Sequence, residues 1–246
     1  MKVFIAVGRY FLFLKRVFSV PDQWRMFYKQ LLLEFEKLGY RSIGIVIIIS
    51  TFIGAIITIQ AQHNTTNPLM PRYTTGLLTR DTLILEFSST VLCLLLAGKI
   101  GSNISSEIGS MRISEQIDAL DVIGINSANY LVLPKIAALV ILMPILVVFS
   151  MFLGVVGGDA VGVFSNIITT SNFIYGIQYD FTPFYVTYSL IKSAVFAFII
   201  ASVSSYYGYF TKGGALNVGN ASTTAVVNSS VLILLFDVIL TEVMLT

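Results

Sequence analysis

Long apolar stretches without charged residues alternate with short polar segments along this chain. No Lys, Arg, Asp or Glu occurs between Arg41 and Arg72, nor within residues 136–158, 193–211 and 213–236. Each stretch can supply the ~20 apolar residues that cross a hydrocarbon core of about 30 Å. A fifth candidate contains Glu86 and Lys99. The pattern predicts an all-α integral membrane protein with about five transmembrane helices, near residues 43–62, 83–104, 134–157, 184–206 and 225–245.

The first 38 residues have a different pattern, in which apolar and basic positions separate onto two helix faces. The apolar face carries Phe4, Val7, Phe11, Leu14 and Phe18, and the basic face carries Lys2, Arg9 and Arg16. This pattern is typical of a helix that lies in the headgroup layer. Pro21 is expected to end it, and a second helix over about 23–38 leads into the first span. We therefore divide the chain into interfacial helices at 1–38 and a transmembrane domain at 39–246; a soluble helical cap is the alternative.

Composition and charge support a membrane protein and predict its orientation. The chain is 56% hydrophobic and 11% charged, and its net charge of +2 is too small to suggest a nucleic-acid partner. Five spans place the termini on opposite sides, and twelve Lys and Arg residues fall on the N-terminal side against Arg72 and Arg80 on the other. The positive-inside rule then predicts a cytoplasmic N-terminus and a periplasmic C-terminus.

The segment around residues 105–126 is polar although it lies between two spans. Small residues recur every fourth position before and within it, and they include Gly98, Gly101, Ser105 and Gly109. Such rows allow another helix to approach closely. Ser114 is the expected N-cap of a short helix, with Glu115 and Asp118 in its first turn and Gly124 as its left-handed stop. A docking element for another protein and a solvated loop explain this segment equally well.

Four stretches of the chain give it a family resemblance. They read KLGYRSIGIVIIISTFIGAIITIQ, AGKIGSNISSEIGSMRISEQIDALDVIGIN, YLVLPKIAAL and TKGGALNVGNASTTAVVNSSVLILLFDVILT. Together they resemble the MlaE-type permeases, the membrane subunits of ABC transporters that move phospholipid between the inner and outer membranes of diderm bacteria. One departure is that Leu85 and Ser88–Ser89 flank Glu86 where the family commonly has Arg and Gly-Pro.

The resemblance implies a set of partners and a coupling segment. The partners are a second copy of the chain, a cytoplasmic ABC ATPase dimer, a periplasmic MCE-domain lipid-binding protein and, in some systems, a STAS-domain subunit; the location is the bacterial inner membrane. The segment after the second span would lie on the ATPase. Its expected coupling residues, several of them charges on a cytoplasmic loop, are Glu107, Met111, Arg112, Glu115, Gln116, Asp118 and Leu120.

Catalytic and metal-binding patterns are missing from the sequence. The glycine-rich stretch at Gly213, Gly214 and Gly219 is not followed by Gly-Lys-Ser/Thr, so it is not a Walker A loop. His63 is the single histidine, which excludes zinc hydrolase patterns. We expect a permease without enzymatic activity, with no catalytic residue, metal or cofactor of its own, and with ATP and Mg²⁺ on the partner ATPase.

Three ionisable residues fall within predicted spans: Glu86, Lys192 and Asp237. Lys192 and Asp237 are each ~12 to 14 Å below the outer ends of their spans, so an ion pair between neighbouring helices is expected.

A different function remains open at this point. Glu86 and Asp237 could serve an ion- or proton-driven secondary transporter of an amphiphile, which would need neither an ATPase nor a docking helix.

Overall fold

The expectation of an all-helical membrane protein is confirmed by the computed structural model, which describes residues 2–20, 24–65, 70–166 and 168–245. No strand occurs in these residues. Five helical stretches within them are long and apolar enough to cross a membrane: Trp24–Asn64, Thr74–Ile113, Ser127–Phe164, Phe184–Tyr209 and Ala215–Leu245. Each expected span falls inside one of these stretches.

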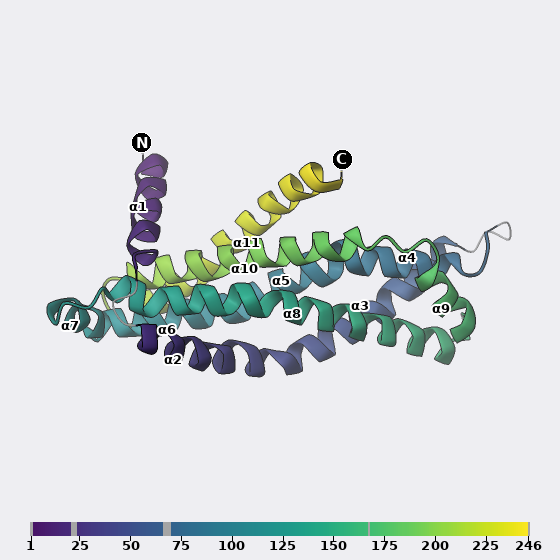
Figure 1. Ribbon diagram of the computed structural model, residues 1–246, viewed down its shortest axis with the longest axis horizontal. Coiled ribbons are helices and arrows are strands. Elements are labelled where there is room, and N and C mark those ends of the chain that lie inside the picture. Colours follow the sequence, from purple (N-terminus) through teal and green to yellow (C-terminus); the bar gives the residue numbers. More distant parts are fainter. Residues whose placement is uncertain (1, 21–23, 66–69, 167, 246) are drawn as a thin grey trace.

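The helices follow one another in a simple order (Figure 1). The first stretch joins α2 (Trp24–Glu34), the π-helical η1 (Phe35–Tyr40) and α3 (Arg41–Asn64). The second joins α4 (Thr74–Thr82), η2 (Leu83–Val91), α5 (Leu92–Leu96), η3 (Ala97–Gly101) and α6 (Ser102–Ile113). The remainder are α1 (Lys2–Val17), α7 (Gln116–Val122), α8 (Ser127–Phe164), α9 (Thr170–Gln178), α10 (Phe184–Tyr209) and α11 (Ala215–Leu245).

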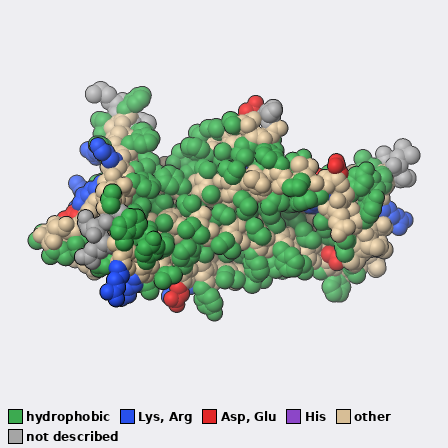
Figure 2. Space-filling model, in the orientation of Figure 1, with side chains coloured by type: hydrophobic (Ala, Val, Ile, Leu, Met, Phe, Trp, Pro, Cys, Tyr) green, Lys and Arg blue, Asp and Glu red, His purple; other side chains and the backbone are tan. Residues whose placement is uncertain are grey.

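The bundle has two distinct ends. Figure 1 shows α7 at one end and α4 and α9 at the other, with the long helices running between them and the C-terminal part of α11 diverging from the rest. The visible flank of the bundle is largely hydrophobic, whereas Lys and Arg side chains lie mostly near the α7 end (Figure 2). A lipid-facing belt with basic residues at one end is the surface that a membrane protein needs.

Helix α1 lies across the long axis of the bundle, near the α7 end (Figure 1). Phe4, Phe11 and Leu12 are exposed on it, while Phe13 and Val17 are buried against the bundle. An orientation across the bundle axis places a helix along the membrane surface, as an interfacial helix requires. Pro21, the expected end of this helix, lies outside the described residues.

Only some of the small residues in the second stretch contact a neighbouring helix. A Cβ on Gly101 would lie 2.8 Å from the Ser204 hydroxyl oxygen of α10, and one on Gly109 would lie 3.1 Å from Val218 of α11. Ser105 is completely buried. A Cβ on Gly98, in contrast, would meet nothing within 4 Å. Close approach by α10 and α11 therefore depends on the row that contains Gly101, Ser105 and Gly109.

Glycines allow the backbones of α3 and α8 to approach closely, and this crossing gives a stability prediction. A Cβ at Gly54 would lie 1.9 Å from the carbonyl oxygen of Gly154, so Gly54→Ala must separate the two helices. We expect Gly54→Ala to lower the free energy of unfolding by about 1–3 kcal/mol, the usual range for an overpacked core. Gly44→Ala on the same helix is the matched control, because its Cβ would meet nothing within 4 Å. Equal melting temperatures of the two variants in detergent would contradict the close α3–α8 crossing.

Candidate functional site

Two clusters of charged side chains connect the helices, one within the spans and one near α7. In the first, Lys192 of α10 lies with its Nζ 2.5 Å from Asp237 Oδ1 of α11. The ion pair expected between these two residues is therefore formed. The Nζ of Lys192 also lies 3.2 Å from Glu86 Oε2 of η2. The intramembrane cluster thus consists of one cation and two carboxylates.

The hydroxyl group of Thr90 completes the intramembrane cluster. Sequence reasoning missed this residue. Thr90 Oγ1 lies 3.1 Å from Glu86 Oε2 and 3.0 Å from Asp237 Oδ1. Thr90 is four residues after Glu86, and this spacing on one helix face is the only sequence signal that both residues point to the same site. The side chain of Lys192 is fully buried and that of Asp237 is 16% exposed, whereas Glu86 is 43% exposed. Glu86 is therefore the member that can reach a ligand or water.

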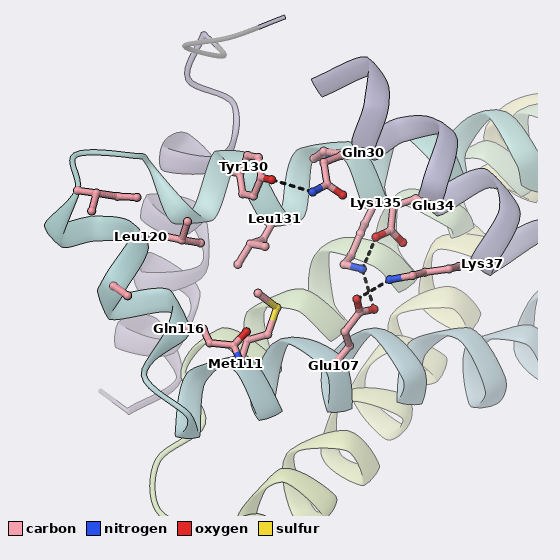
Figure 3. Close-up of a pocket in the computed structure, with 13 residues that line it drawn as sticks. Gln30, Glu34, Lys37, Glu107, Met111, Gln116, Leu120, Tyr130, Leu131 and Lys135 are labelled. Carbon is pink, nitrogen blue, oxygen red and sulfur yellow. Dashed lines mark hydrogen bonds and ion pairs between the residues drawn. The ribbon is translucent and has the colours of Figure 1, made fainter. Parts of the chain in front are cut away.

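The second cluster is an ion-pair network of Glu34, Lys37, Glu107 and Lys135, drawn in Figure 3. Lys135 Nζ of α8 lies 2.6 Å from Glu34 Oε1 of α2 and 2.8 Å from Glu107 Oε2 of α6. Lys37 Nζ of η1 lies 2.9 Å from Glu107 Oε1. The network therefore links the first, second and third spanning stretches at their α7 end.

The ion-pair network corrects one expectation. Glu107 was expected among charges on a cytoplasmic loop, but it lies within α6 and has two lysine partners in its own chain. Sequence reasoning missed Glu34, Lys37 and Lys135 entirely. The sequence held one signal for Lys135. This lysine stands one residue before a long charge-free stretch, so it lies inside the helix and needs a buried partner if the helix begins earlier. The helix does begin earlier, at Ser127.

A cavity of about 480 Å³ separates this network from α7 (Figure 3). Its walls include four of the expected coupling residues, Glu107, Met111, Gln116 and Leu120. Gln30 and Tyr130 close another wall through a hydrogen bond of 2.8 Å, donated by the Gln30 amide to the Tyr130 hydroxyl. The other three, Arg112 of α6, Glu115 and Asp118 of α7, do not line this cavity.

The short helix begins one residue later than expected. The Ser114 hydroxyl donates a 2.8 Å hydrogen bond back to the Ser110 carbonyl of α6, so Ser114 is not the N-cap. Glu115 takes the N-cap position in a left-handed conformation with φ of 60°, and α7 starts at Gln116. The sharp turn at Glu115 is what separates α7 from α6. Gly124 has φ of +85° and supplies the expected left-handed stop.

Helix α7 is attached to the bundle on one side and exposed on the other. Ile117 is fully buried, and Arg112 of α6 pairs with Asp118 of α7 at 2.6 Å. Val122 and Ile123, by contrast, are 86% and 68% exposed at the end of the helix. An exposed apolar tip on a helix whose other face is held by the bundle is typical of a surface that another protein covers.

Helix α7 is also connected to α1. Arg16 Nη2 lies 2.8 Å from Asp121 Oδ1, and the Ser127 backbone N–H donates to the same oxygen. Burial raises the pKa of the Asp121 carboxyl, but the hydrogen bonds from Ser127 and Arg16 outweigh burial, so this pKa lies below its ordinary value. Asp121 is therefore charged at neutral pH and holds α1 against α7.

Comparison with known proteins places this architecture in a family. The family model described as "Permease MlaE" matches residues 5–243. A relative from Rickettsia bellii, named a probable ABC transporter permease protein, is 34% identical over 96% of this chain and 91% of its own length. The intermembrane phospholipid transport system permease protein MlaE of Haemophilus influenzae is 28% identical over 98% and 92%. The chloroplastic protein TRIGALACTOSYLDIACYLGLYCEROL 1 of Arabidopsis thaliana is 33% identical over 92% of this chain and 63% of its own length. The five apolar helices and the α6–α7 segment thus lie within a match that covers nearly the whole sequence, and the chain belongs to the MlaE permease family.

Proposed function

We propose that this chain is the permease subunit of an ABC transporter that moves phospholipid between the inner and outer membranes, and that a separate cytoplasmic ATPase drives it. The names of the Rickettsia and Haemophilus relatives support this proposal. ATP and Mg²⁺ belong to the ATPase in this scheme, and the permease binds no cofactor. The names give no support to the ion-driven transporter that Glu86 and Asp237 left open.

The proposed arrangement places α7 and the N-terminus in the cytoplasm and the C-terminus in the periplasm of the bacterial inner membrane. The gathering of Lys and Arg near α7 supports this orientation (Figure 2). Two copies of the chain would form the transport unit. A periplasmic MCE-domain protein would exchange lipid at the α4–α9 end, and a STAS-domain subunit would accompany the ATPase.

The observation that carries the coupling role is the exposed apolar tip of α7. Val122 and Ile123 project from a short helix whose other face is held by Ile117 and by the Arg112–Asp118 pair. Because these contacts fix α7 to the bundle, a movement imposed on its tip would also move α6 and α8. We therefore assign the ATPase contact to the α7 tip, with Glu115 and Gln116 at the other end of α7 and with Met111, Leu120 and Glu107 lining the cavity behind it.

Co-purification with the ATPase tests this assignment. Val122→Glu with Ile123→Glu is expected to abolish co-purification and ATP-driven lipid transfer, because two charges would replace the apolar contact. The matched control is Val163→Glu with Phe164→Glu, an exposed pair at the opposite end of α8. The control is expected to retain the ATPase. Retention of the ATPase by the well-folded α7 variant would show that the contact lies elsewhere.

A further inference from the structure

A groove of about 530 Å³ lies between α1 and the C-terminal end of α10, apart from both charged clusters. Arg9, Leu12, Phe13 and Arg16 of α1 form one wall, and Tyr206, Tyr209, Phe210 and Lys212 form the other. The transport scheme above assigns nothing to this groove. Its lining combines aromatic rings with cations, and these two kinds of group lie in different parts of it.

Aromatic rings form the floor of the groove. The Phe13 side chain is 3% exposed, and its ring centroid lies 5.2 Å from that of Tyr209 and 5.7 Å from those of Tyr206 and Phe210. The contacts with Tyr206 and Phe210 are edge-to-face and the contact with Tyr209 is tilted, and such contacts hold the rings in fixed positions. The floor is therefore a rigid apolar surface.

Cations form the rim, and two of them lack an acidic partner among the described residues. Arg16 is neutralised by Asp121, and the nearby Arg112 is neutralised by Asp118. No ion pair involves Arg9 or Lys212 in the part of the chain that the structure describes. Both side chains are exposed. The rim thus presents two uncompensated positive charges beside an apolar floor, and an anion would satisfy them.

The position of the groove identifies the kind of anion. Helix α1 lies across the bundle axis with Phe11 and Leu12 exposed at 64% and 69%, so the groove opens at the level where headgroups meet acyl chains. Free phosphate would use the rim and leave the aromatic floor empty. A phospholipid uses both, and basic pockets beside membrane helices are suited to anionic headgroups.

We propose that this groove binds an anionic phospholipid of the leaflet at the α7 end, with its phosphate at Arg9 and Lys212 and its apolar part against the Phe13 floor. The lipid is a resident ligand and not cargo, so the inference does not rest on the transport function. Because Arg16 links α1 to Asp121 of α7, a bound lipid would hold α1 in place and steady the α7 helix.

Native mass spectrometry of the full chain in detergent tests the proposal. The protein is titrated with dioleoyl phosphatidylglycerol and, separately, with dioleoyl phosphatidylcholine. Arg9→Gln with Lys212→Gln is expected to weaken phosphatidylglycerol binding by roughly tenfold or more, since each basic residue near an anionic lipid contributes to affinity. Arg25→Gln with Lys29→Gln removes the same charge from exposed positions of α2 and is expected to bind as the parent does.

Three outcomes would overturn the proposal. The first is equal affinity for the two lipids in the parent protein. The second is undiminished phosphatidylglycerol binding by a folded Arg9→Gln, Lys212→Gln variant, or by Lys212→Gln alone if the double variant does not fold. The third is displacement of the lipid by millimolar inorganic phosphate, which would indicate a site for free anions. Retained selectivity in the presence of phosphate, lost only in the rim variants, is the supporting result.

Discussion

Lys192→Met is expected to lower the free energy of unfolding by about 3–5 kcal/mol, the range found when one partner of a buried ion pair is removed. Lys192 is the only cation that contacts Asp237 and Glu86 in the described residues, and its side chain is fully buried. Its removal leaves two carboxylates close together, and the Thr90 hydroxyl between them has a single proton to donate to one or the other. Burying such a charge without a partner is costly, so α10 and α11 should separate or admit water.

A second substitution separates loss of charge balance from loss of packing. Lys192→Met with Asp237→Leu removes the two most buried charges, and the remaining carboxylate of Glu86 is 43% exposed and can be solvated. We expect the double variant to recover much of the lost stability. Chemical unfolding in mixed micelles measures the double variant and each single change, Lys192→Met and Asp237→Leu, and Lys29→Met at an exposed position of α2 is the control. A double variant no more stable than the sum of the single changes would contradict the pairing.

The spans and the Lys192–Asp237 pair could be predicted because their signals are local. Charge-free stretches mark four of the five spans, and equal depth in two spans brings Lys192 and Asp237 within reach. The left-handed stop at Gly124 is local as well. Ser114 shows the limit of this reasoning, because a serine near a helix start is also well placed to bond back to the preceding turn.

Contacts between distant helices could not be predicted in the same way. Lys135 is 101 residues from Glu34, and Lys192 is 106 residues from Glu86. Their meeting depends on how α2, α8, η2 and α10 are rotated about their axes, and small rotations exchange one helix face for another. The average hydrophobicity of a span does not show which of its faces points to which neighbouring helix, because both faces of a buried helix are apolar. The ion-pair network and the groove beside α1 therefore emerge only with the packed structure.

The ion-pair network gives the last prediction, which compares two lysines that share one partner. Lys135 and Lys37 both contact Glu107, but the Lys135 side chain is 2% exposed and the Lys37 side chain is 48% exposed. Lys135→Met strands the buried carboxylate of Glu34 and is expected to cost about 3 kcal/mol or more. Lys37→Met breaks a solvated pair and is expected to cost less than about 1 kcal/mol.

The same pair of variants tests whether the network connects α7 to the first span. Because Lys135 joins α2, α6 and α8, its loss should also weaken the response of lipid transfer to ATP, while Lys37→Met should leave that response nearly intact. Glu34→Gln removes the stranded charge, so Lys135→Met with Glu34→Gln should regain stability without regaining ATP-driven transfer. Recovery of both properties together would show that the network only stabilises the fold. Equal costs for the two lysines would instead show that Lys135 is not buried between the helices.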